Sequence, residues 1–347
     1  MPEQRLPPAV DHDQPRIMEV SPAKTVRHVP LAPHQLTDRI TPARDVFILS
    51  HVGIPRARAK DWWLDVTGLV SRLRRFTLNE IKQFPKKTVN SLHECAGFPM
   101  APHIATRRVA NVAWGGASLA TILDAVGVEP EARYLWSYGV DRGVFEDVKS
   151  NVYVKDMPLS RIPTGDVLLA YELNGEPLDC EHGFPLRLLI PGYYGTNSVK
   201  WLYRLELSDR RPDGPFTTRY YNDPIEPDPA APEIKTRPVW EIAPESVIVS
   251  PAKGDRLSLE EISIWGWAWA DGGIRDVEVS TDGGNNWMKA ELEERMGWAW
   301  QRFTLPWQPT APGSYTLQSR ATNSLGRVQP ANNARNCVYE IEVHVVE

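Results

Sequence analysis

The alternation of apolar and polar residues is clearest in the last third of the chain. Its period of two in WGWAWA is typical of a β-strand, and the DGG of TDGGNNW is a hairpin-turn sequence. Six or seven short strands over about 100 residues predict an immunoglobulin-like β-sandwich, here without the usual cysteine pair. The predicted strands lie in SVIVS, EISIWGWAWA, RDVEVSTDGG, GWAWQRFTL, GSYTLQSRAT and VYEIEVHVV.

The preceding region has a mixed pattern that predicts both helices and strands. Apolar residues at helical spacing in SLATILDAVGV predict a helix between an N-cap at Ser118 and a C-cap at Gly127. LNEIKQF predicts a shorter helix that is opened by Thr77 or Asn79. Strands are predicted in DVFILSH, WWLDVTGLV, ARYLWSYGV, DVLLAYELNG and LRLLIPG.

Proline-rich segments divide the chain. The predicted organisation is an extended N-terminal arm (1–40), a mixed α+β domain (41–225), a linker rich in proline and acidic residues (226–239) and the β-sandwich (240–347). The fold class predicted is therefore α+β, with an all-β second domain.

The composition is that of a globular protein and excludes several partners. The chain has 347 residues, 42% of them hydrophobic, and a net charge of −5. No apolar run approaches the roughly 20 residues that span a bilayer, so neither nucleic acid nor a membrane is an expected partner. The start of the chain has no apolar signal segment, which predicts a cytoplasmic protein, or a periplasmic one if a signal peptide was removed. Three cysteines are too few for a disulfide framework.

Two segments could carry chemistry. Cys95 in SLHECAGFPMAPH is followed by Ala96 and Gly97, which leave room beside a thiolate that suits a soft metal ion; the alternative is a buried small residue. In EHGFPLRLLIPGYYGTNSVKW, residues 181–201, cationic side chains flank a turn that contains Gly and Ser. Such a segment predicts an anion pocket, and the alternative is a buried strand followed by an irregular loop.

These segments resemble the sulfite oxidase family of molybdopterin-dependent oxidoreductases. The run at 166–202 is similar to the family's most distinctive signature, CAG at 95–97 to its molybdenum-ligand motif and FILSHVGIP at 47–55 to its pterin-contacting strand and loop. The tryptophan-rich second domain resembles the family's dimerisation domain. The resemblance implies a molybdenum–pyranopterin cofactor, with Cys95 as the metal ligand and Tyr171 as the active-site tyrosine. It further implies that the cofactor is held by Phe47, His51, Asp141, His182, Arg187, Ser198 and Lys200.

The chain departs from the family where substrate arginines are expected. Phe98, Pro99 and Met100 follow CAG in place of Asn-Arg-Arg, and Leu49 stands where the family has arginine. Arg107 and Arg108 are candidates to replace these groups in catalysis, with simple surface charge as the alternative. Arg335 is a further candidate near the C-terminus.

The function expected is oxidation of sulfite or a related small sulfur-containing substrate by oxygen-atom transfer at molybdenum. The chain has no C-x-x-C-H haem motif, so the electrons should pass to an external acceptor such as a cytochrome. The missing arginines leave a sulfane dehydrogenase-like enzyme, or another substrate, as an alternative. An alternative of another class is a cofactor-free immunoglobulin-like binding protein. The tryptophan-rich strands predict an exposed apolar surface and therefore a homodimer through residues 240–347.

Overall fold

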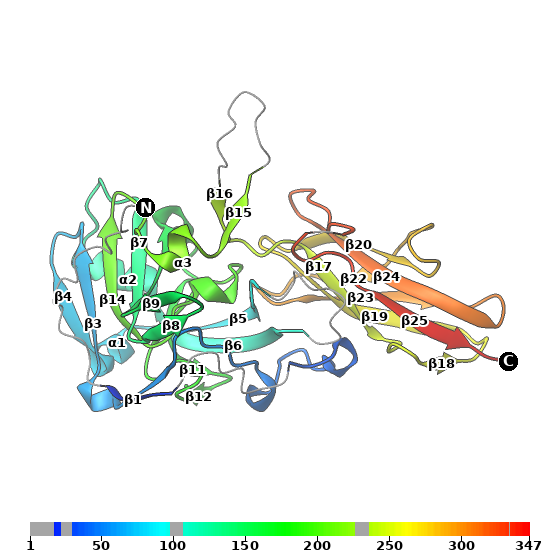
Figure 1. Cartoon of the computed structure of the whole chain (residues 1–347), viewed down its shortest axis with the longest axis horizontal. Coiled ribbons are helices and arrows are strands. Elements are labelled where there is room, and N and C mark those ends of the chain that lie inside the picture. Colours follow the sequence, from blue (N-terminus) through cyan, green and yellow to red (C-terminus); the bar gives the residue numbers. More distant parts are fainter. Residues whose placement is uncertain (1–16, 22–29, 98–106, 226–235, 333) are drawn as a thin grey trace, which may run out of the picture.

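The computed structural model describes residues 17–21, 30–97, 107–225, 236–332 and 334–347. Two β-rich parts lie next to each other along the long axis of the molecule (Figure 1). Within these described ranges, the first part contains two main sheets of five strands each and three short α-helices, and the regular elements of the second part are all strands. This arrangement confirms the predicted α+β domain followed by an immunoglobulin-like β domain, although the helices are short.

One sheet of the first part is mixed. In spatial order its strands are β10 (Tyr153–Pro158), β7 (Tyr134–Gly139), β14 (Leu202–Ser208), β3 (Trp63–Gly68) and β4 (Arg74–Thr77). β14 and β3 are parallel, and the other neighbours are antiparallel. Burial alternates along β7, as expected for a strand with one face on the core.

The second sheet of this part is antiparallel and supplies the floor of the candidate site. Its longest pair, β5 and β6, ends at Glu94, directly before Cys95. In spatial order its strands are β12 (Glu176–Pro177), β11 (Leu168–Leu173), β6 (Val109–Ser118) and β5 (Lys86–Glu94), and β13 (Arg187–Leu189) also pairs with β11.

Short helices complete the first part. α1 (Leu78–Gln83) begins at Thr77, whose hydroxyl accepts from the backbone N–H of Glu80, so one of the two predicted caps is confirmed. α2 (Leu119–Val126) begins after Ser118 and ends at Gly127 as predicted, but the Ser118 side chain donates to the Gly165 carbonyl and does not cap the helix. The remaining helical segments are α3 (Pro215–Thr218) and the 3₁₀ turns η1 (Pro33–Gln35), η2 (Ala43–Asp45), η3 (Ala59–Asp61), η4 (Leu159–Thr164) and η5 (Gly195–Asn197).

The prediction of a strand in DVFILSH is wrong. η2 ends in this segment, residues 46–53 form an irregular loop, and the strand β2 (Ile54–Ala57) begins only after it, where it pairs with β1 (Ile17–Ser21). Of its apolar residues, Val46, Phe47 and Leu49 line a cavity rather than a sheet face, and Val52 packs in the hydrophobic core. Two further hairpins pair β8 (Gly143–Phe145) with β9 (Val148–Ser150) and β15 (Asn222–Pro224) with β16 (Thr236–Pro238).

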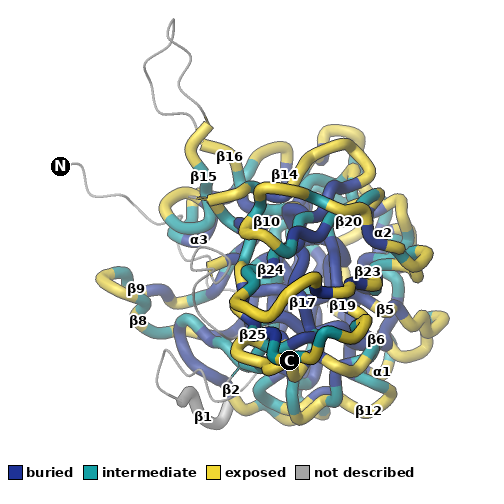
Figure 2. Tube along the Cα trace, turned by 90° about the vertical axis from the view of Figure 1, so that its right-hand side faces the viewer, coloured by how far each residue is buried: buried dark blue, intermediate teal, exposed yellow. Residues whose placement is uncertain are grey.

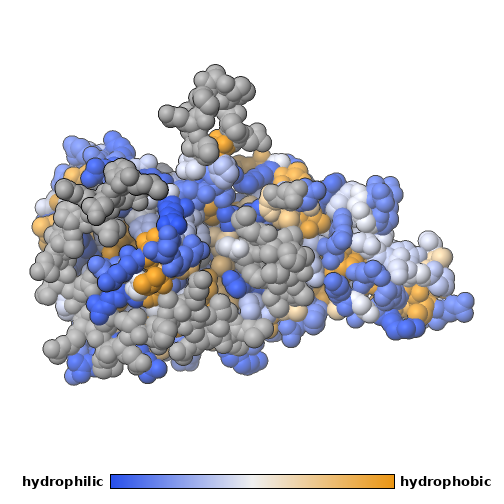
Figure 3. All heavy atoms as spheres, in the orientation of Figure 1, coloured by the Kyte–Doolittle hydropathy of each residue, from blue (hydrophilic) through white to orange (hydrophobic). Residues whose placement is uncertain are grey.

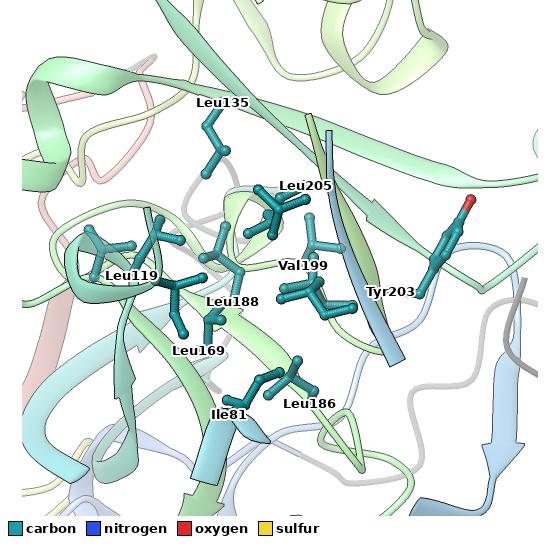
Figure 4. Close-up of a cluster of buried hydrophobic side chains, with 14 of the residues drawn as sticks. Ile81, Leu119, Leu135, Leu169, Leu186, Leu188, Val199, Tyr203 and Leu205 are labelled. Carbon is teal, nitrogen blue, oxygen red and sulfur yellow. The ribbon is translucent and has the colours of Figure 1, made fainter. Parts of the chain in front are cut away.

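The largest hydrophobic core fills the space between the two sheets of the first part. Side chains from α1, α2 and both sheets point toward one another in it, among them Leu119, Leu169, Leu188 and Leu205 (Figure 4). Buried segments occupy the interior and exposed residues lie mainly in the outer loops (Figure 2). The two sheets are thus fixed relative to each other, which fixes the loops at their ends.

The second part is a sandwich of two sheets. The first consists of β17 (Glu245–Ser250), β19 (Ile262–Trp269), β23 (Gln301–Trp307) and β22 (Glu291–Leu292). The second consists of β18 (Arg256–Leu257), β25 (Glu340–Val345), β24 (Gly313–Asn323), β20 (Ile274–Ser280) and β21 (Met288–Lys289). Apolar residues from both sheets form a separate core. The strands match the predicted segments because period-two alternation is read locally.

Three tryptophans of the predicted strands lie between the two parts of the chain, which corrects the expectation that such rings form a dimer surface. Trp267, Trp269 and Trp300 are at most 2% exposed and pack with Leu36 and Leu92 between the two parts of the chain. The ring N–H groups of Trp267 and Trp300 donate to the backbone carbonyls of Leu36 and Arg39. These rings therefore leave no apolar patch for a second copy.

The surface of the sandwich carries smaller apolar groups. On the face shown in Figure 3, its hydrophobic residues form separate patches between hydrophilic ones. Its exposed large apolar side chains include Leu325, at 88% exposure, and Met296, at 57%. Among the described residues, no helix has the length and apolar character needed to cross a membrane. Most of the predicted linker, residues 226–235, lies outside the described residues.

Candidate active site

A cavity opens at the end of β5, where loops from both sheets of the first part meet. It is lined by eight of the residues predicted for the site: Phe47, His51, Cys95, Asp141, His182, Arg187, Ser198 and Lys200. These residues are up to 153 positions apart in the chain (47 to 200), so only the fold brings them together.

Cys95 lies at the first position after β5. It is a free cysteine with 7% exposure, and its backbone N–H donates to the carbonyl of Arg108 at 3.0 Å. The backbone approaches closely from the other side, because a Cβ added to Gly195 would lie 2.7 Å from His93 Nε2 and 3.1 Å from the Glu94 carbonyl oxygen. The thiol is thus held at the cavity by backbone contacts.

Two buried cations occupy one side of the cavity. Arg187 donates to the carbonyls of His182 and Ser198, each at 3.0 Å, and Lys200 donates to those of Leu49 and Glu181 at 3.0 and 2.9 Å. Burial lowers the pKa of Arg187 to about 9, and burial together with Arg187 lowers that of Lys200 to about 7. Among the described residues neither forms an ion pair with a carboxylate. Two buried cations that make no direct ion pair among the described residues form a pocket for an anion such as a phosphate.

Several polar atoms at the cavity have no hydrogen-bond partner among the described residues. They include Asp141 Oδ1, His182 Nε2, Arg187 Nε and His93 Nδ1. Asp179 accepts a hydrogen bond from the His182 backbone and lies 2.8 Å from His182 Nδ1, so the ring is fixed with Nε2 free. Burial raises the pKa of Asp141 to about 7, and Lys200 opposes this rise. These atoms fit the polar edges of a pterin, and the cations fit its phosphate.

A group of rings also lines the cavity. His51 stacks on Tyr153, with ring centroids 5.7 Å apart, and its Nε2 is hydrogen-bonded to the hydroxyl of Tyr221. Burial, together with the positive charges of Lys200 and Lys155, lowers the pKa of His51 to about 3. The imidazole is therefore neutral at physiological pH and can share one proton with the phenol.

Tyr171 does not line the cavity. Its ring lies in the hydrophobic core of the first part, on β11, and faces Lys82 at 5.3 Å. The tyrosines at the cavity are Tyr153 and Tyr221, neither of which was predicted. Tyr221 follows Lys200 by 21 residues without a recognisable motif, so no sequence signal pointed to it.

His93 also lines the cavity and was not predicted from the sequence. It precedes Cys95 by two positions on an extended segment, which places both side chains on one face, and this spacing was a usable signal. Its ring stacks on Phe47 with centroids 5.7 Å apart. Burial lowers the pKa of His93 well below its usual range, so it is a neutral wall of the cavity.

The candidate substrate arginines have different positions. Arg107 is buried near Glu245, with Nε 3.6 Å from the carboxylate Oε1, and its guanidinium lies over Tyr339. Neither Arg107 nor Arg108 lines the cavity. Arg335 contacts the residue after Cys95, because its Nη1 donates to the carbonyl of Ala96, and its Nη2 pairs with Asp223 at 2.7 Å. Phe98, Pro99 and Met100 lie outside the described residues.

A buried carboxylate links the site to the sandwich. Glu94 accepts hydrogen bonds from the Trp269 ring at 3.0 Å and from the Asn336 amide at 3.2 Å. Burial and the neighbouring Glu245 raise the pKa of Glu94 well above its usual range. The residue before Cys95 is thus anchored to the second part of the chain.

Both parts match known domains. Residues 51–216 match the oxidoreductase molybdopterin binding domain, and residues 236–343 match the Mo-co oxidoreductase dimerisation domain. Sulfite oxidase of Gallus gallus is 30% identical over 316 residues, which cover 84% of this chain and 68% of that protein.

Two further similarities concern the extent of the match. Mitochondrial sulfite oxidase of Drosophila melanogaster is 30% identical over 320 residues. That match covers 84% of this chain but only 55% of the relative, so the chain spans about half of that protein's length. The crystal structure of the sulfane dehydrogenase SoxCD from Paracoccus pantotrophus superposes with a TM-score of 0.77 at 28% identity. That match covers 93% of this chain and 87% of that one.

Proposed function

Because the chain belongs to the sulfite oxidase family of molybdopterin oxidoreductases, we propose that it oxidises a small sulfur compound and passes the electrons to an external acceptor. The observation that carries this proposal is the cavity that brings Cys95 together with the buried cations Arg187 and Lys200. An immunoglobulin-like binding protein without a cofactor has no use for two buried cations that make no direct ion pair among the described residues, because their desolvation is costly.

When bound, the cofactor would supply a two-electron redox centre capable of oxygen-atom transfer. Cys95 would provide a soft thiolate ligand to the metal. Arg187 and Lys200 would neutralise the phosphate of the pterin, and Asp141 Oδ1 and His182 Nε2 would meet its polar edges. Tyr221 would hold a proton at its hydroxyl, next to the neutral His51.

The polarity of the cavity favours a substrate that is less charged than sulfite. Leu49 lines the cavity where the family has an arginine, and both ends of the Arg335 guanidinium are engaged, by Ala96 and Asp223. Each lost charge-assisted hydrogen bond weakens the binding of a dianion by roughly 1.5–3 kcal/mol. This favours the second candidate substrate, a sulfane sulfur on a carrier, and the similar structure of a sulfane dehydrogenase supports it.

Metal analysis and turnover test the proposal. Purified protein should contain about one molybdenum per chain and should reduce a dye acceptor anaerobically with a sulfur compound. Sulfite and thiosulfate are tested with an oxidised dye as electron acceptor. A sulfoxide and nitrate are tested with a reduced dye as electron donor, so that oxidation of sulfur compounds is compared with reduction of oxygen-atom donors. Protein that contains molybdenum but oxidises no sulfur compound refutes the substrate class, and protein without molybdenum refutes the enzyme.

The assembly and the compartment are further proposals. We propose a homodimer, supported by the match of residues 236–343 to a dimerisation domain. We also propose a cytoplasmic location, or a periplasmic one after removal of a signal peptide; the free thiols of Cys95, Cys180 and Cys337 fit the former. A cytochrome is the kind of acceptor that we propose.

A further inference from the structure

Lys155 is a buried cation that the proposed chemistry does not use. It lies on β10, its side chain is 1% exposed, and its Nζ donates to the backbone carbonyl of Phe216 at 2.8 Å. Its neighbour Asp156 is already paired with Arg211 at 2.6 Å. Among the described residues Lys155 forms no ion pair with a carboxylate. A buried ammonium is costly, and an apolar side chain would fill the same space at lower cost.

The ammonium of Lys155 faces one of the tyrosines of the cavity. Its Nζ lies 5.2 Å from the centroid of the Tyr221 ring, within the range of a cation–π interaction. Tyr221 lines the cavity, and its hydroxyl is hydrogen-bonded to His51. Lys155 itself does not line the cavity, so it can affect a ligand there only through its charge or through Tyr221.

We propose that Lys155 is a positioning residue that acts through Tyr221: its charge, held by the Phe216 carbonyl against the ring, makes the Tyr221 hydroxyl a stronger donor toward an anion in the cavity. In this arrangement His51 Nε2–H donates to the Tyr221 oxygen, so that the phenol proton is free for the anion. The inference rests on the proposed function, since it concerns the anionic substrate or product of the same site. A cation at the ring face withdraws electron density from the phenol, and a more acidic phenol donates a stronger hydrogen bond. Lys155 thereby supplies part of the attraction that an arginine at Leu49 would supply.

The charge of Lys155 depends on pH in the physiological range. Burial lowers its pKa to about 7, Asp156 raises it, and Arg211 lowers it. The other titratable groups that face it are Tyr221, His51 and Tyr153. His51 is neutral, and burial raises the pKa values of both tyrosines, so none of the three changes charge between pH 6 and 8.5. The attraction is therefore present below pH 7 and is lost as the pH rises above it.

Asp141 and Lys200 also titrate near pH 7 at the cavity, so a pH profile of the native protein alone does not isolate Lys155. The comparison of matched variants does. Lys155→Gln keeps a donor for the Phe216 carbonyl and removes the charge, whereas Lys155→Met removes both. If Lys155 acts only through its hydrogen bond to the Phe216 carbonyl, the Met variant should differ from native and the Gln variant should not. If it acts through its charge, the two variants should behave alike.

The test is the binding of sulfate to the cofactor-loaded protein, measured by calorimetry at pH 6 and pH 8.5. At pH 6 both variants should bind sulfate on the order of tenfold more weakly than the native protein, the effect of one partly screened charge. At pH 8.5 the three proteins should agree within about twofold, because Lys155 is then neutral in the native protein as well. In a Tyr221→Phe background, replacing Lys155 should have little further effect at either pH.

Three results overturn the inference. The first is that the Gln and Met variants bind sulfate like the native protein at pH 6, and the second is that their loss of sulfate affinity is equal at both pH values. The third is that the native protein shows no measurable sulfate binding at pH 6. If neither Lys155 variant folds, Tyr221→Phe decides. Its loss of sulfate affinity should be larger at pH 6 than at pH 8.5, and a loss independent of pH overturns the inference. None of these readouts requires turnover, so a protein that oxidises no sulfur compound refutes the proposed function without deciding the role of Lys155.

Discussion

Removing the charge of Lys200 should make the cofactor-free protein less sensitive to pH. Lys200 is buried, and its pKa of about 7 lies well below the ordinary value of 10.5. Between these two values the unfolded chain binds a proton that the folded chain does not bind, so the free energy of unfolding rises with pH. From pH 7 to pH 9.5 this rise amounts to about 3 kcal/mol, at 1.36 kcal/mol per pH unit.

Lys200→Met removes this contribution together with two hydrogen bonds, to the carbonyls of Leu49 and Glu181. The lost hydrogen bonds cost about 2–4 kcal/mol at every pH. The relief of the buried charge stabilises the variant by about 5 kcal/mol below pH 7, but by only about 1–2 kcal/mol at pH 9.5. The variant should therefore be as stable as the native protein or more stable at pH 7, and less stable at pH 9.5. Without Lys200 the pKa of Asp141 should rise further, which destabilises the folded variant at high pH and adds to the same difference.

The assay is urea unfolding of cofactor-free protein at pH 7 and pH 9.5, with Lys87→Met as the control. Lys87 is a surface residue whose side chain is 43% exposed and pairs with Asp166. The difference in unfolding free energy between native and Lys200→Met protein should change by about 3 kcal/mol between the two pH values. The corresponding difference between native and Lys87→Met protein should change by less than about 0.5 kcal/mol. A change below about 1 kcal/mol for Lys200→Met would refute the reasoning that burial depresses this pKa.

Four other predictions concern the site and the assembly. Cys95→Ser should keep the pterin but lose turnover with a dye acceptor, because a hydroxyl is a poor ligand for molybdenum; native activity would reject Cys95 as the ligand. Arg187→Ala should lower cofactor content, as measured in purified protein against the exposed control Arg44→Ala, and equal content in both would reject the phosphate pocket. Tyr221→Phe should reduce turnover while Tyr171→Phe keeps it, and the reverse result would restore Tyr171 to the active site. Light scattering should give about twice the chain mass of 39.2 kDa, and a monomer at micromolar concentration would contradict the dimer.

Sulfite should be a poor substrate. Leu49 offers no fork for the oxyanion, and Arg335 is engaged by Ala96 and Asp223, so the Michaelis constant should lie in the millimolar range. Steady-state kinetics with sulfite and a dye acceptor measures it. A micromolar constant with rapid turnover would show that arginines from other loops complete the pocket.

Local patterns were sufficient for most of the second domain and for the helices. Alternation in EISIWGWAWA and the cap at Thr77 act within a few residues, so they can be read from neighbouring positions. The anion pocket was also predictable, because Arg187 and Lys200 lie close together in one segment with a turn between them.

Other features depend on contacts between residues far apart in the chain. The apolar run DVFILSH has the composition of a strand, but it forms a cavity loop and pairs with none of the described strands. The tryptophans of the sandwich were expected at a dimer surface, yet Trp267 and Trp300 are buried against the first part of the same chain. Composition shows that such apolar rings must be buried against some surface. It does not show whether that surface belongs to a second copy or to the same chain.

The tyrosine of the cavity shows the same limit. Tyr171 stands in the most distinctive motif, but its place on β11 directs it into the core, whereas Tyr221 reaches the cavity from a hairpin without a motif. The role inferred for the charge of Lys155 likewise depends on its contact with the Tyr221 ring, which the sequence does not show. Periodicity and caps are short-range properties and therefore legible in the sequence. The choice of which side chains share a cavity depends on how two sheets and their end loops pack, and that packing is decided only in three dimensions.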